Sequence, residues 1–484
     1  MFIDKKQIID RIHSDNSWWQ ENSIEIFFKK MSKRPYFDIF YPLVIEKEIK
    51  RAVVLMGPRR VGKTVMINHT IQKLIDEGIE SNKICYFSID TPTYSKIPLE
   101  SLLIYFLEIN KLNKNDDLYI FFDEIQYLNN WELHLKSLVD TYHNIKFIVS
   151  GSSAAALKLK SIESGAGRFT DFILPPLSFY EYLVLRYENS KEAIFWNENI
   201  EKNIDKLNSE FLYFINFGGY PEVSISKIAQ ENINRYLKND IIEKVLLKDL
   251  PNLYGVQDIQ ELNVLFNYIA YNTGLEFSLD AIASNSGVAK NTIKKYLQYL
   301  EAAFLIHIVH RIDQNSKKFK KANFFKVYLT NTSLRSALFM SANKEDKNFG
   351  NIVESAIYAQ YYHQRYILKN IYYARWNEGE VDVVILDPIY QKPYFALEIK
   401  WSNRFAEDPK QLRKILNFCN KNNIKTLHVT TIDILKEEYF GDILIKFIPA
   451  AILALIESSV AFKIQRDTSN LSIDELMKQL NDKI

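Results

Sequence analysis

The sequence predicts an α/β protein with a parallel, doubly wound sheet, then a mainly helical segment, then a smaller α/β region. Three observations support this fold class. Short apolar runs alternate with helical patterns over the first 150 residues, which is typical of a parallel sheet covered by helices on both faces. A glycine-rich turn follows the first apolar run. Alternating elements return over residues 349–465, after a long helical stretch.

The size and composition of the chain indicate a multidomain globular protein. It has 484 residues, of which 47% are hydrophobic and 25% charged, and its formal net charge is +2. This length suggests roughly three domains. The small net charge leaves any contact with nucleic acid to local patches. The two cysteines, Cys85 and Cys419, lie far apart beside apolar residues, which favours a reducing compartment over a disulfide framework.

No segment has the pattern of a secretory signal or of a membrane span. The first eleven residues mix acids and bases without an apolar core, unlike a signal peptide. The longest apolar run, Phe447–Ile456, is too short to cross a bilayer and is interpreted as a buried element. We therefore expect a cytoplasmic protein without a membrane partner.

The first sheet is expected to contain four buried strands separated by helices. Apolar runs of this length are typical of strands that are covered on both faces. The expected strands are Arg51–Met56, Lys83–Ile89, Leu118–Phe122 and Lys146–Ser150. Helical patterns lie between them and take over from Ser178 to about Leu250, with one break at Gly218, Gly219 and Pro221.

The turn after the first strand has the pattern of a phosphate-binding loop. Residues 57–64 read Gly-Pro-Arg-Arg-Val-Gly-Lys-Thr, the P-loop or Walker A spacing between a strand and a helix. Glycines let backbone N–H groups point at phosphate oxygens, and the helix N-terminus favours negative charge. The pattern predicts ATP with Mg²⁺ as cofactors. The predicted contacts are Gly57, Pro58, Arg59, Arg60, Val61, Gly62, Lys63 at the terminal phosphates, Thr64 on Mg²⁺, and Val65.

A second motif supplies the acids that ATP hydrolysis requires. The apolar strand Leu118–Phe122 ends in Asp123 and Glu124, about sixty residues after the glycine-rich loop. We expect Asp123 to hold Mg²⁺, largely through water. Glu124 is predicted to be the catalytic base that polarises the attacking water.

Two further residues near this site have two interpretations each. Ser150 or Ser152, after the fourth strand, either senses the γ-phosphate or caps a helix. Arg168, in a Gly-Ala-Gly-Arg-Phe segment, is either an arginine finger acting within or between subunits or a surface arginine paired with a carboxylate. A finger acting between subunits would require a homo-oligomer.

Residues 258–330 resemble a winged helix. Ser278–Ala283, Gly287 and the helix Asn291–Ala303 have helix–turn–helix spacing, and two strand-like runs follow. Lysines on the second helix and in the loop between the strands would contact phosphates of DNA without reading bases. The alternatives are a protein contact or a solvated loop. The lysines are Lys290, Lys294, Lys295, Lys317, Lys318, Lys320 and Lys321.

Two acidic segments near the C-terminus predict a second metal site. Side chains alternate along strands, so Glu380, Asp382 and Val384 are expected on one face of the first strand. Glu398 and Lys400 are expected on one face of the next strand. Pairing these strands would bring together Asp382, Glu398 and Lys400, an arrangement suited to metal-dependent phosphodiester cleavage.

Two other acids and an alternative complete this prediction. Glu354, on the preceding helix, is the expected third metal ligand. Glu380, at the start of its strand, is expected to be solvated. The alternatives are a surface ion pair between Glu398 and Lys400, or a fold that persists without its chemistry.

Several of these motifs together resemble a known family. They are Gly57–Thr64, Asp123-Glu-Ile-Gln-Tyr-Leu with Trp131 after it, Ser150-Gly-Ser-Ser, and Gly167-Arg-Phe leading into Pro176-Leu-Ser-Phe. They resemble bacterial and archaeal AAA-type ATPases that carry a C-terminal domain of unknown function, often likened to restriction endonucleases. The resemblance implies an AAA-like ATPase core, and it favours the arginine-finger role for Arg168.

The C-terminal acids are similar to the Asp…Glu-x-Lys pattern of restriction-endonuclease-like nucleases. Val381 stands where a proline often precedes the first acid. Gln411 stands where some of these nucleases have a supporting glutamine.

The expected organisation follows from these segments. The predicted parts are an N-terminal helical extension (1–35), a P-loop AAA-like ATPase domain with a helical lid (36–230), a winged-helix domain (231–345), a restriction-endonuclease-like domain (346–465) and a tail (466–484). The predicted function is ATP binding and hydrolysis, coupled to DNA binding or cleavage by the nuclease-like domain. The alternative is an ATP-gated binding or signalling switch whose nuclease-like domain is inactive.

Overall fold

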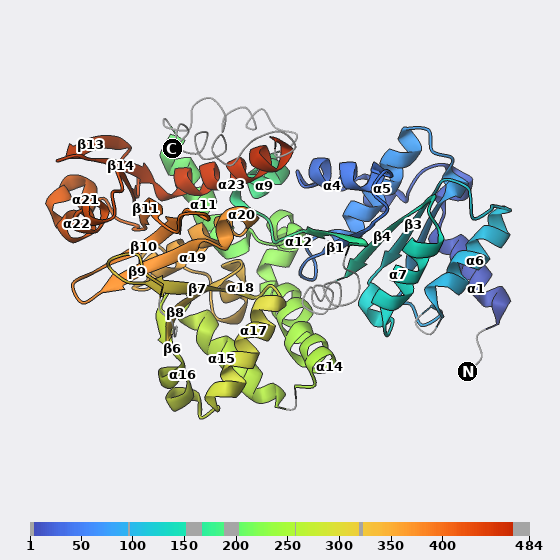
Figure 1. The fold of residues 1–484 in the computed structure, drawn as a ribbon, viewed down its shortest axis with the longest axis horizontal. Helices are drawn as coiled ribbons and strands as arrows, with labels where there is room; N and C mark the ends of the chain where they lie inside the picture. Colours follow the sequence, from blue (N-terminus) through green and yellow to red (C-terminus); the bar gives the residue numbers. More distant parts are fainter. Residues whose placement is uncertain are drawn as a thin grey trace. The chain divides into compact units, whose positions relative to one another are not determined.

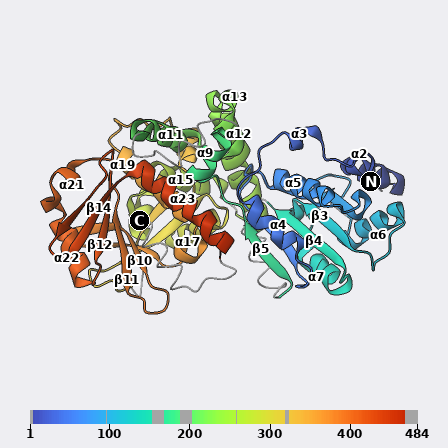
Figure 2. The same ribbon diagram turned by 90° about the horizontal axis from the view of Figure 1, so that it is seen from above.

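A computed structural model describes residues 4–94, 97–151, 167–187, 203–256, 258–318 and 323–467. The chain divides into two compact units, Met1–Pro175 and Pro176–Ile484. Figures 1 and 2 show their elements from two sides. The helices after residue 176, which were expected to include the helical lid, belong to the second unit; the expected domain limits stay a prediction.

The first unit contains a five-stranded, all-parallel sheet in the order β2-β3-β4-β1-β5. Its strands are β1 (Ala52–Met56), β2 (Ile84–Ser88), β3 (Leu118–Asp123), β4 (Ile145–Gly151) and β5 (Phe169–Ile173). Its helices are α1 (Lys5–Asp15), α2 (Trp18–Glu21), α3 (Ile26–Lys29), α4 (Phe37–Ile45), α5 (Lys63–Asp76), η1 (Ser81–Lys83), α6 (Leu99–Asn110), η2 (Ile125–Tyr127) and α7 (Trp131–Thr141). The prediction of a parallel α/β fold is confirmed, and β5 is a strand that the sequence did not indicate.

Helices cover both faces of this sheet (Figure 1). Every residue of β1, β3 and β4 is buried, which explains why these strands read as continuous apolar runs. The carboxyl ends of β1, β3 and β4 lie at one edge of the sheet, where parallel α/β folds bind ligands.

The N-terminal helices protect the outer edge of the sheet at β2. The Asn16 side chain donates to the Tyr86 carbonyl at 3.0 Å and accepts from the Tyr86 N–H at 2.7 Å. The indole N–H groups of Trp18 and Trp19 donate to the Ile84 carbonyl at 3.2 and 2.8 Å. These side chains occupy backbone groups that an edge strand would otherwise expose.

The second unit contains a nine-stranded mixed sheet in the order β13-β14-β12-β11-β10-β9-β7-β8-β6. Its strands are β6 (Glu276–Ser278), β7 (Ile306–Ile312), β8 (Phe324–Leu329), β9 (Ile371–Trp376), β10 (Gly379–Leu386), β11 (Pro393–Glu398), β12 (Thr426–Thr431), β13 (Lys436–Phe440) and β14 (Ile443–Pro449). The strands of the expected winged-helix and nuclease-like domains join in this one sheet, because β7 pairs in parallel with β9.

The helices of this unit fall into three groups along the chain. Before the sheet come α9 (Phe179–Tyr187), α11 (Ile204–Phe217), α12 (Pro221–Ile225), α13 (Lys227–Glu231), the π-helical η5 (Asn234–Glu243) and η6 (Val245–Asp249), and α14 (Leu250–Tyr254). Then come α15 (Ile259–Tyr271), α16 (Leu279–Ser286), α17 (Lys290–Ala302) and α18 (Ser333–Leu338). The last group is α19 (Phe349–Tyr361), α20 (Arg365–Leu368), α21 (Arg404–Glu407), η7 (Pro409–Leu412), α22 (Arg413–Lys421) and α23 (Ala450–Asp467).

Residues 259–329 follow the element order expected from their helix–turn–helix spacing. Ser278 caps α16 by accepting a bond from the Ala281 N–H, and Gly287 ends that helix at φ +72°. Strand β8 then pairs with both β6 and β7.

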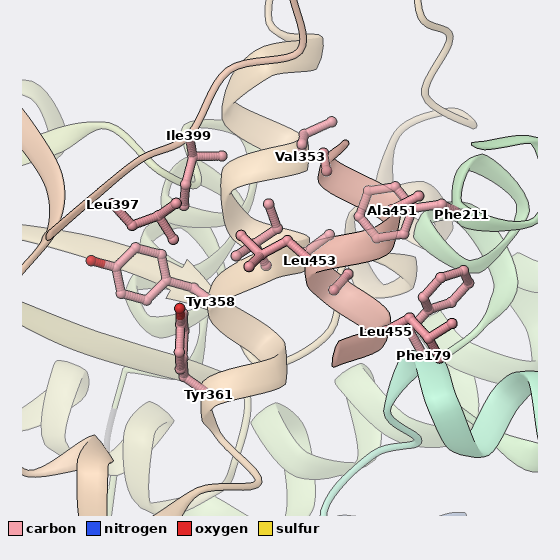
Figure 3. Close-up of a cluster of buried hydrophobic side chains, with 14 of the residues drawn as sticks. Phe179, Phe211, Val353, Tyr358, Tyr361, Leu397, Ile399, Ala451, Leu453 and Leu455 are labelled. Carbon is pink, nitrogen blue, oxygen red and sulfur yellow. The ribbon is translucent and has the colours of Figure 1, made fainter. Parts of the chain in front are cut away.

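Apolar side chains cover both faces of the larger sheet. One face packs on α19 and α23 through a cluster that includes Val353, Leu397, Ile399 and Leu453 (Figure 3). Phe447–Ile456, expected to be buried, forms the end of β14 and the start of α23. No helix of the described residues is long and apolar enough to span a membrane.

A bulge in β10 changes one expected face. The register with β9 shifts between Val381 and Val384. Both valines therefore pack on the face that carries α22, whereas Val383 faces α19 and α23. Strict alternation, which placed Val384 beside Asp382, is wrong at this point because a bulge adds one residue to the strand.

Candidate functional site

The glycine-rich loop joins β1 to α5 and needs glycine at two positions. A Cβ on Gly57 would lie 2.1 Å from the carbonyl oxygen of Leu174, the residue after β5, so the backbone there leaves no space for a side chain. Gly62 has φ +95° and immediately precedes α5, a backbone conformation that glycine adopts readily. The loop thus lies where the sequence predicted it, against the N-terminus of a helix.

Buried cations hold this loop. The Lys63 ammonium donates to the carbonyls of Gly57 and Pro58 at 3.1 and 2.8 Å. Arg34 donates to the carbonyls of Val61 and Pro175, both at 2.9 Å. Sequence reasoning missed Arg34, which comes from a segment 27 residues before the loop carbonyl that it bonds.

Asp123 lies beside the loop and is surrounded by hydroxyl groups. Thr64 Oγ1 donates to Asp123 Oδ2 at 2.7 Å, and the Tyr86 hydroxyl donates to the same oxygen at 2.9 Å. The Ser150 hydroxyl donates to Oδ1. Burial raises the pKa of Asp123, and the nearby Glu124 charge adds to this effect. Three hydroxyl donors thus hold the carboxyl.

Glu124 directly follows this strand in a left-handed conformation, φ +53°. Its carboxylate accepts a bond from the Gln126 amide, and its N–H donates to Asp123 Oδ1 at 3.1 Å. Ser150 also accepts from the Glu124 N–H at 3.4 Å. Ser150 thus contacts the Asp123 carboxyl and the Glu124 backbone. Its roles at the γ-phosphate or as a helix cap stay predictions, and Ser152 lies outside the described residues.

Arg168 lies at the amino-terminal ends of the sheet's strands, whereas the glycine-rich loop lies at their carboxyl ends. Phe169 pairs with Ala52 at the start of β1, whereas the loop follows Met56 at its end. The five residues of β1 separate these two ends by about 16 Å. Arg168 forms an ion pair with Asp140 at 2.7 Å. This geometry does not support a finger acting within its own subunit; a role between subunits stays a prediction.

The residues beside the loop fit a magnesium ion bound with a nucleotide. Mg²⁺ prefers hard oxygen ligands and is usually held by one or two carboxylates together with substrate phosphates. Thr64 and Asp123 present such oxygens 2.7 Å apart. The described contacts to the Asp123 carboxyl come from hydroxyls and one N–H, so no ammonium group competes with a metal there.

The predicted C-terminal residues also come together. The Lys400 ammonium lies 3.0 Å from Asp382 Oδ2 and 2.8 Å from Glu398 Oε1. The Ile399 N–H donates to Asp382 Oδ2 at 2.9 Å. Asp382 and Glu398 are buried, so the alternative of a surface pair between Glu398 and Lys400 does not describe the site.

Lys326 belongs to the same cluster, and sequence reasoning missed it. It lies on β8, and its ammonium is 2.8 Å from Glu354 Oε1, 3.3 Å from Asp382 Oδ1 and 2.5 Å from Glu380 Oε1. Glu380 therefore makes an ion pair, although it was expected to be solvated. We call Lys326, Glu354, Glu380, Asp382, Glu398 and Lys400 the carboxylate cluster.

Burial and the two lysines act in opposite directions on these acids. Burial raises the pKa of Glu354 and of Glu398, and the Asp382 charge adds to both. Burial would also raise the pKa of Asp382, but Lys400 and Lys326 outweigh it and lower that pKa. The two lysines therefore favour the ionised form of Asp382.

The cluster does not fit a metal ion as it is arranged. Among the described residues, no group of three His, Cys, Asp or Glu side chains is positioned to hold a metal. Glu398 Oε2 is buried without a hydrogen-bond partner, but both oxygens of Asp382 already contact ammonium groups. Gln411 is exposed and donates to Asp408 at 3.1 Å instead of supporting the cluster.

Comparison with known families supports the interpretation of the first site. Residues 49–183 match the family model of an AAA domain. This match includes the glycine-rich loop, Asp123, Glu124 and β5. The N-terminal unit is similar to AAA-type ATPases. Residues 208–346 match a domain of unknown function.

Three relatives align with most of the chain. Two are uncharacterized proteins of Methanocaldococcus jannaschii, 28% and 26% identical, which cover 84% and 75% of this chain and 85% and 80% of their own lengths. The third, an uncharacterized protein of Haemophilus influenzae, is 24% identical and covers 78% of this chain and 88% of its own length.

Solved structures give weaker likenesses. A Walker-type ATPase of Pyrococcus abyssi has a TM-score of 0.34 and 14% identity, and the match covers 69% of this chain and 97% of that one. A DNA replication initiation factor has a TM-score of 0.24 and 13% identity, with coverages of 71% and 82%. Scores this low carry no argument about the present chain.

The lysines predicted to contact DNA differ in their surroundings. Lys294 and Lys295 are exposed on α17, whereas Lys290 forms an ion pair with Asp280. Lys317 is exposed, and Lys318 donates to Gln391 at 2.6 Å. Lys320 and Lys321 lie outside the described residues.

Proposed function

We propose that this protein binds ATP with Mg²⁺ and hydrolyses it at the glycine-rich loop. The observation that carries the proposal is the 2.7 Å contact between Thr64 and Asp123 beside the loop. The two motifs are 59 residues apart in sequence, and an Mg·ATP site needs both in one place.

Each residue has a distinct task in the proposed reaction. Bound Mg²⁺ supplies charge neutralisation at the phosphate oxygens. The loop residues from Gly57 to Thr64, except Pro58, offer backbone N–H groups to the phosphates, and Lys63 exchanges its two carbonyl partners for the terminal phosphates. Gln126 orients Glu124, which polarises the attacking water.

Phosphate release from ATP by the full chain tests this proposal. Glu124→Gln removes the base and should lower turnover about a thousandfold, within the usual range for general-base loss, while nucleotide binding persists. Lys63→Ala should weaken ATP binding itself. Glu48→Gln, at an exposed glutamate, is the matched control. Wild-type turnover in Glu124→Gln would overturn the proposal.

We further propose that α17 contacts the phosphate backbone of DNA. The exposed Lys294 and Lys295 and the order of elements around α17 support this contact. Lys294→Ala with Lys295→Ala should weaken duplex binding equally across sequences and reduce its salt dependence. The exposed pair Lys344 and Lys347 gives the control double variant. Unchanged DNA affinity in the α17 variant would favour a protein contact.

The carboxylate cluster does not fit a metal ion as it is arranged. We therefore favour an ATP-gated switch over a nuclease as the second candidate function. Its acids contact the ammonium groups of Lys326 and Lys400, and no cleavage step follows from that arrangement. ATP turnover would then alter a binding surface of the second unit. A cleavage assay distinguishes the switch from the nuclease. The protein is incubated with labelled linear and circular DNA and Mg²⁺ or Mn²⁺, with and without ATP. Cutting that Lys400→Ala abolishes would reject the switch.

A further inference from the structure

Lys326 reaches the carboxylate cluster from a distant part of the sheet. Strands β7 and β9 lie between β8, which carries Lys326, and β10, which carries Glu380 and Asp382. The Lys326 side chain is only 4% exposed. A lysine is seldom buried so completely unless acids compensate its charge.

The surroundings of Lys326 hold it in this position. Its ammonium lies 5.4 Å from the centre of the Tyr373 ring. The Tyr328 hydroxyl donates to Glu354 Oε1 at 2.6 Å, the same oxygen that contacts Lys326. The Tyr328 ring also stacks on the Tyr358 ring, with the ring centres 3.8 Å apart. The Tyr358 hydroxyl donates to the backbone carbonyl of Asp382 at 2.6 Å. These contacts connect β8, α19 and β10 around one cation.

The lysines occupy the oxygens that a metal ion would need. Each of the four acids contacts at least one ammonium group, and Asp382 contacts both. Mg²⁺ requires oxygen ligands at about 2.1 Å in octahedral geometry. A divalent ion among these oxygens would also lie close to a buried ammonium, and like charges repel strongly where water is excluded.

We propose that Lys326 takes the place of a divalent metal in the carboxylate cluster. While its ammonium lies against Glu354, Glu380 and Asp382, the cluster is closed to metal ions. The acids then hold β8, α19 and β10 together through an internal cation. This inference concerns the second unit and does not rest on ATP hydrolysis.

Manganese binding to the full chain without nucleotide tests the inference directly. Electron paramagnetic resonance distinguishes free from bound Mn²⁺, and an Asp382→Asn background assigns binding to the cluster. The wild type should bind no Mn²⁺ that depends on Asp382. Lys326→Met should gain one such site, with affinity about tenfold or more above any binding by the wild type, because Glu354 and Glu380 lose the Lys326 ammonium and Asp382 keeps only Lys400. Lys326→Arg keeps the charge and should stay closed.

Thermal unfolding gives a second readout, because Lys326→Met removes a buried charge. Mn²⁺ should raise the melting temperature of Lys326→Met but not that of Lys326→Arg. Asp382-dependent Mn²⁺ binding by the wild type would overturn the inference, whether or not Lys326→Met folds. A folded Lys326→Met protein that gains no metal site would also overturn it.

Discussion

The two acidic sites of this chain differ in the groups that contact their carboxylates. At the glycine-rich loop, hydroxyls of Thr64, Tyr86 and Ser150 hold Asp123. In the carboxylate cluster, the ammonium groups of Lys326 and Lys400 hold the acids. Hydroxyls stabilise a carboxylate without cancelling its charge, whereas ammonium groups cancel it. The first site therefore remains able to attract a cation, and the second already contains cations.

The largest expected difference between the sites is in ATP turnover. Asp123→Asn removes the charge that attracts Mg²⁺ and should lower turnover about a hundredfold or more, since metal stabilisation is worth several kcal/mol. Phosphate release at fixed ATP and varied Mg²⁺ measures it. Asp90→Asn, an exposed acid after β2, is the control. Turnover that survives in Asp123→Asn would contradict the assigned metal role.

The second expected difference is in the free energy of unfolding. Removing the acid should lower it at one site but not at the other. Asp382→Asn leaves the buried Lys326 and the partly exposed Lys400 short of a partner and should lower the free energy of unfolding by about 3 kcal/mol. Asp123→Asn should leave it unchanged or raise it, because burial disfavours the charge of Asp123. Urea unfolding compares both with the exposed control Asp442→Asn. Equal effects of the two substitutions would remove the proposed difference.

Glu457 extends the comparison to a buried acid whose described hydrogen-bond partners include no lysine. Gln364 and Tyr361 donate to its buried carboxyl at 2.7 and 3.2 Å. Burial raises the pKa of Glu457 from 4.5 to about 7. Folding therefore favours the protonated form, and this group's contribution to stability is lost as pH rises from about 4.5 through 7.

Glu457→Gln should remove this pH dependence. The wild type should lose about 2 to 3 kcal/mol more than the variant between pH 5 and pH 8. Urea midpoints at both pH values measure the difference. Parallel pH profiles of wild type and variant would show that Glu457 does not titrate as proposed.

The smallest expected effect is at Arg168. Its pair with Asp140 is exposed, and such pairs contribute about 1 kcal/mol or less. Arg168→Ala should therefore leave stability nearly unchanged. If Arg168 acts between subunits, the variant should lose the dependence of ATP turnover on protein concentration. Turnover per chain that is independent of concentration in the wild type would argue against that role.

The nucleotide site could be predicted from sequence because its parts are short local motifs. Gly57 to Thr64 and Asp123-Glu124 each lie at the end of an apolar strand, and parallel strands bring such ends together. The hydroxyl of Tyr86 and the guanidinium of Arg34 were not foreseen, because nothing local distinguishes them from other polar residues.

The carboxylate cluster could be predicted only in part. Strand alternation brought together Asp382, Glu398 and Lys400, and the amphipathic helix α19 supplied Glu354. Lys326 was missed because it lies alone in an apolar strand of another segment, and only the sheet order brings it to the acids. The bulge at Val381 was missed because its extra residue has no pattern in a run of valines.

Counting bound Mn²⁺ on the full chain, with a non-hydrolysable ATP analogue, tests the difference between the sites most directly. Asp123→Asn and Asp382→Asn assign each ion to its site. The predicted result is one Mn²⁺ per chain, lost in Asp123→Asn and retained in Asp382→Asn. A second Mn²⁺ in the wild type that disappears in Asp382→Asn would contradict the account.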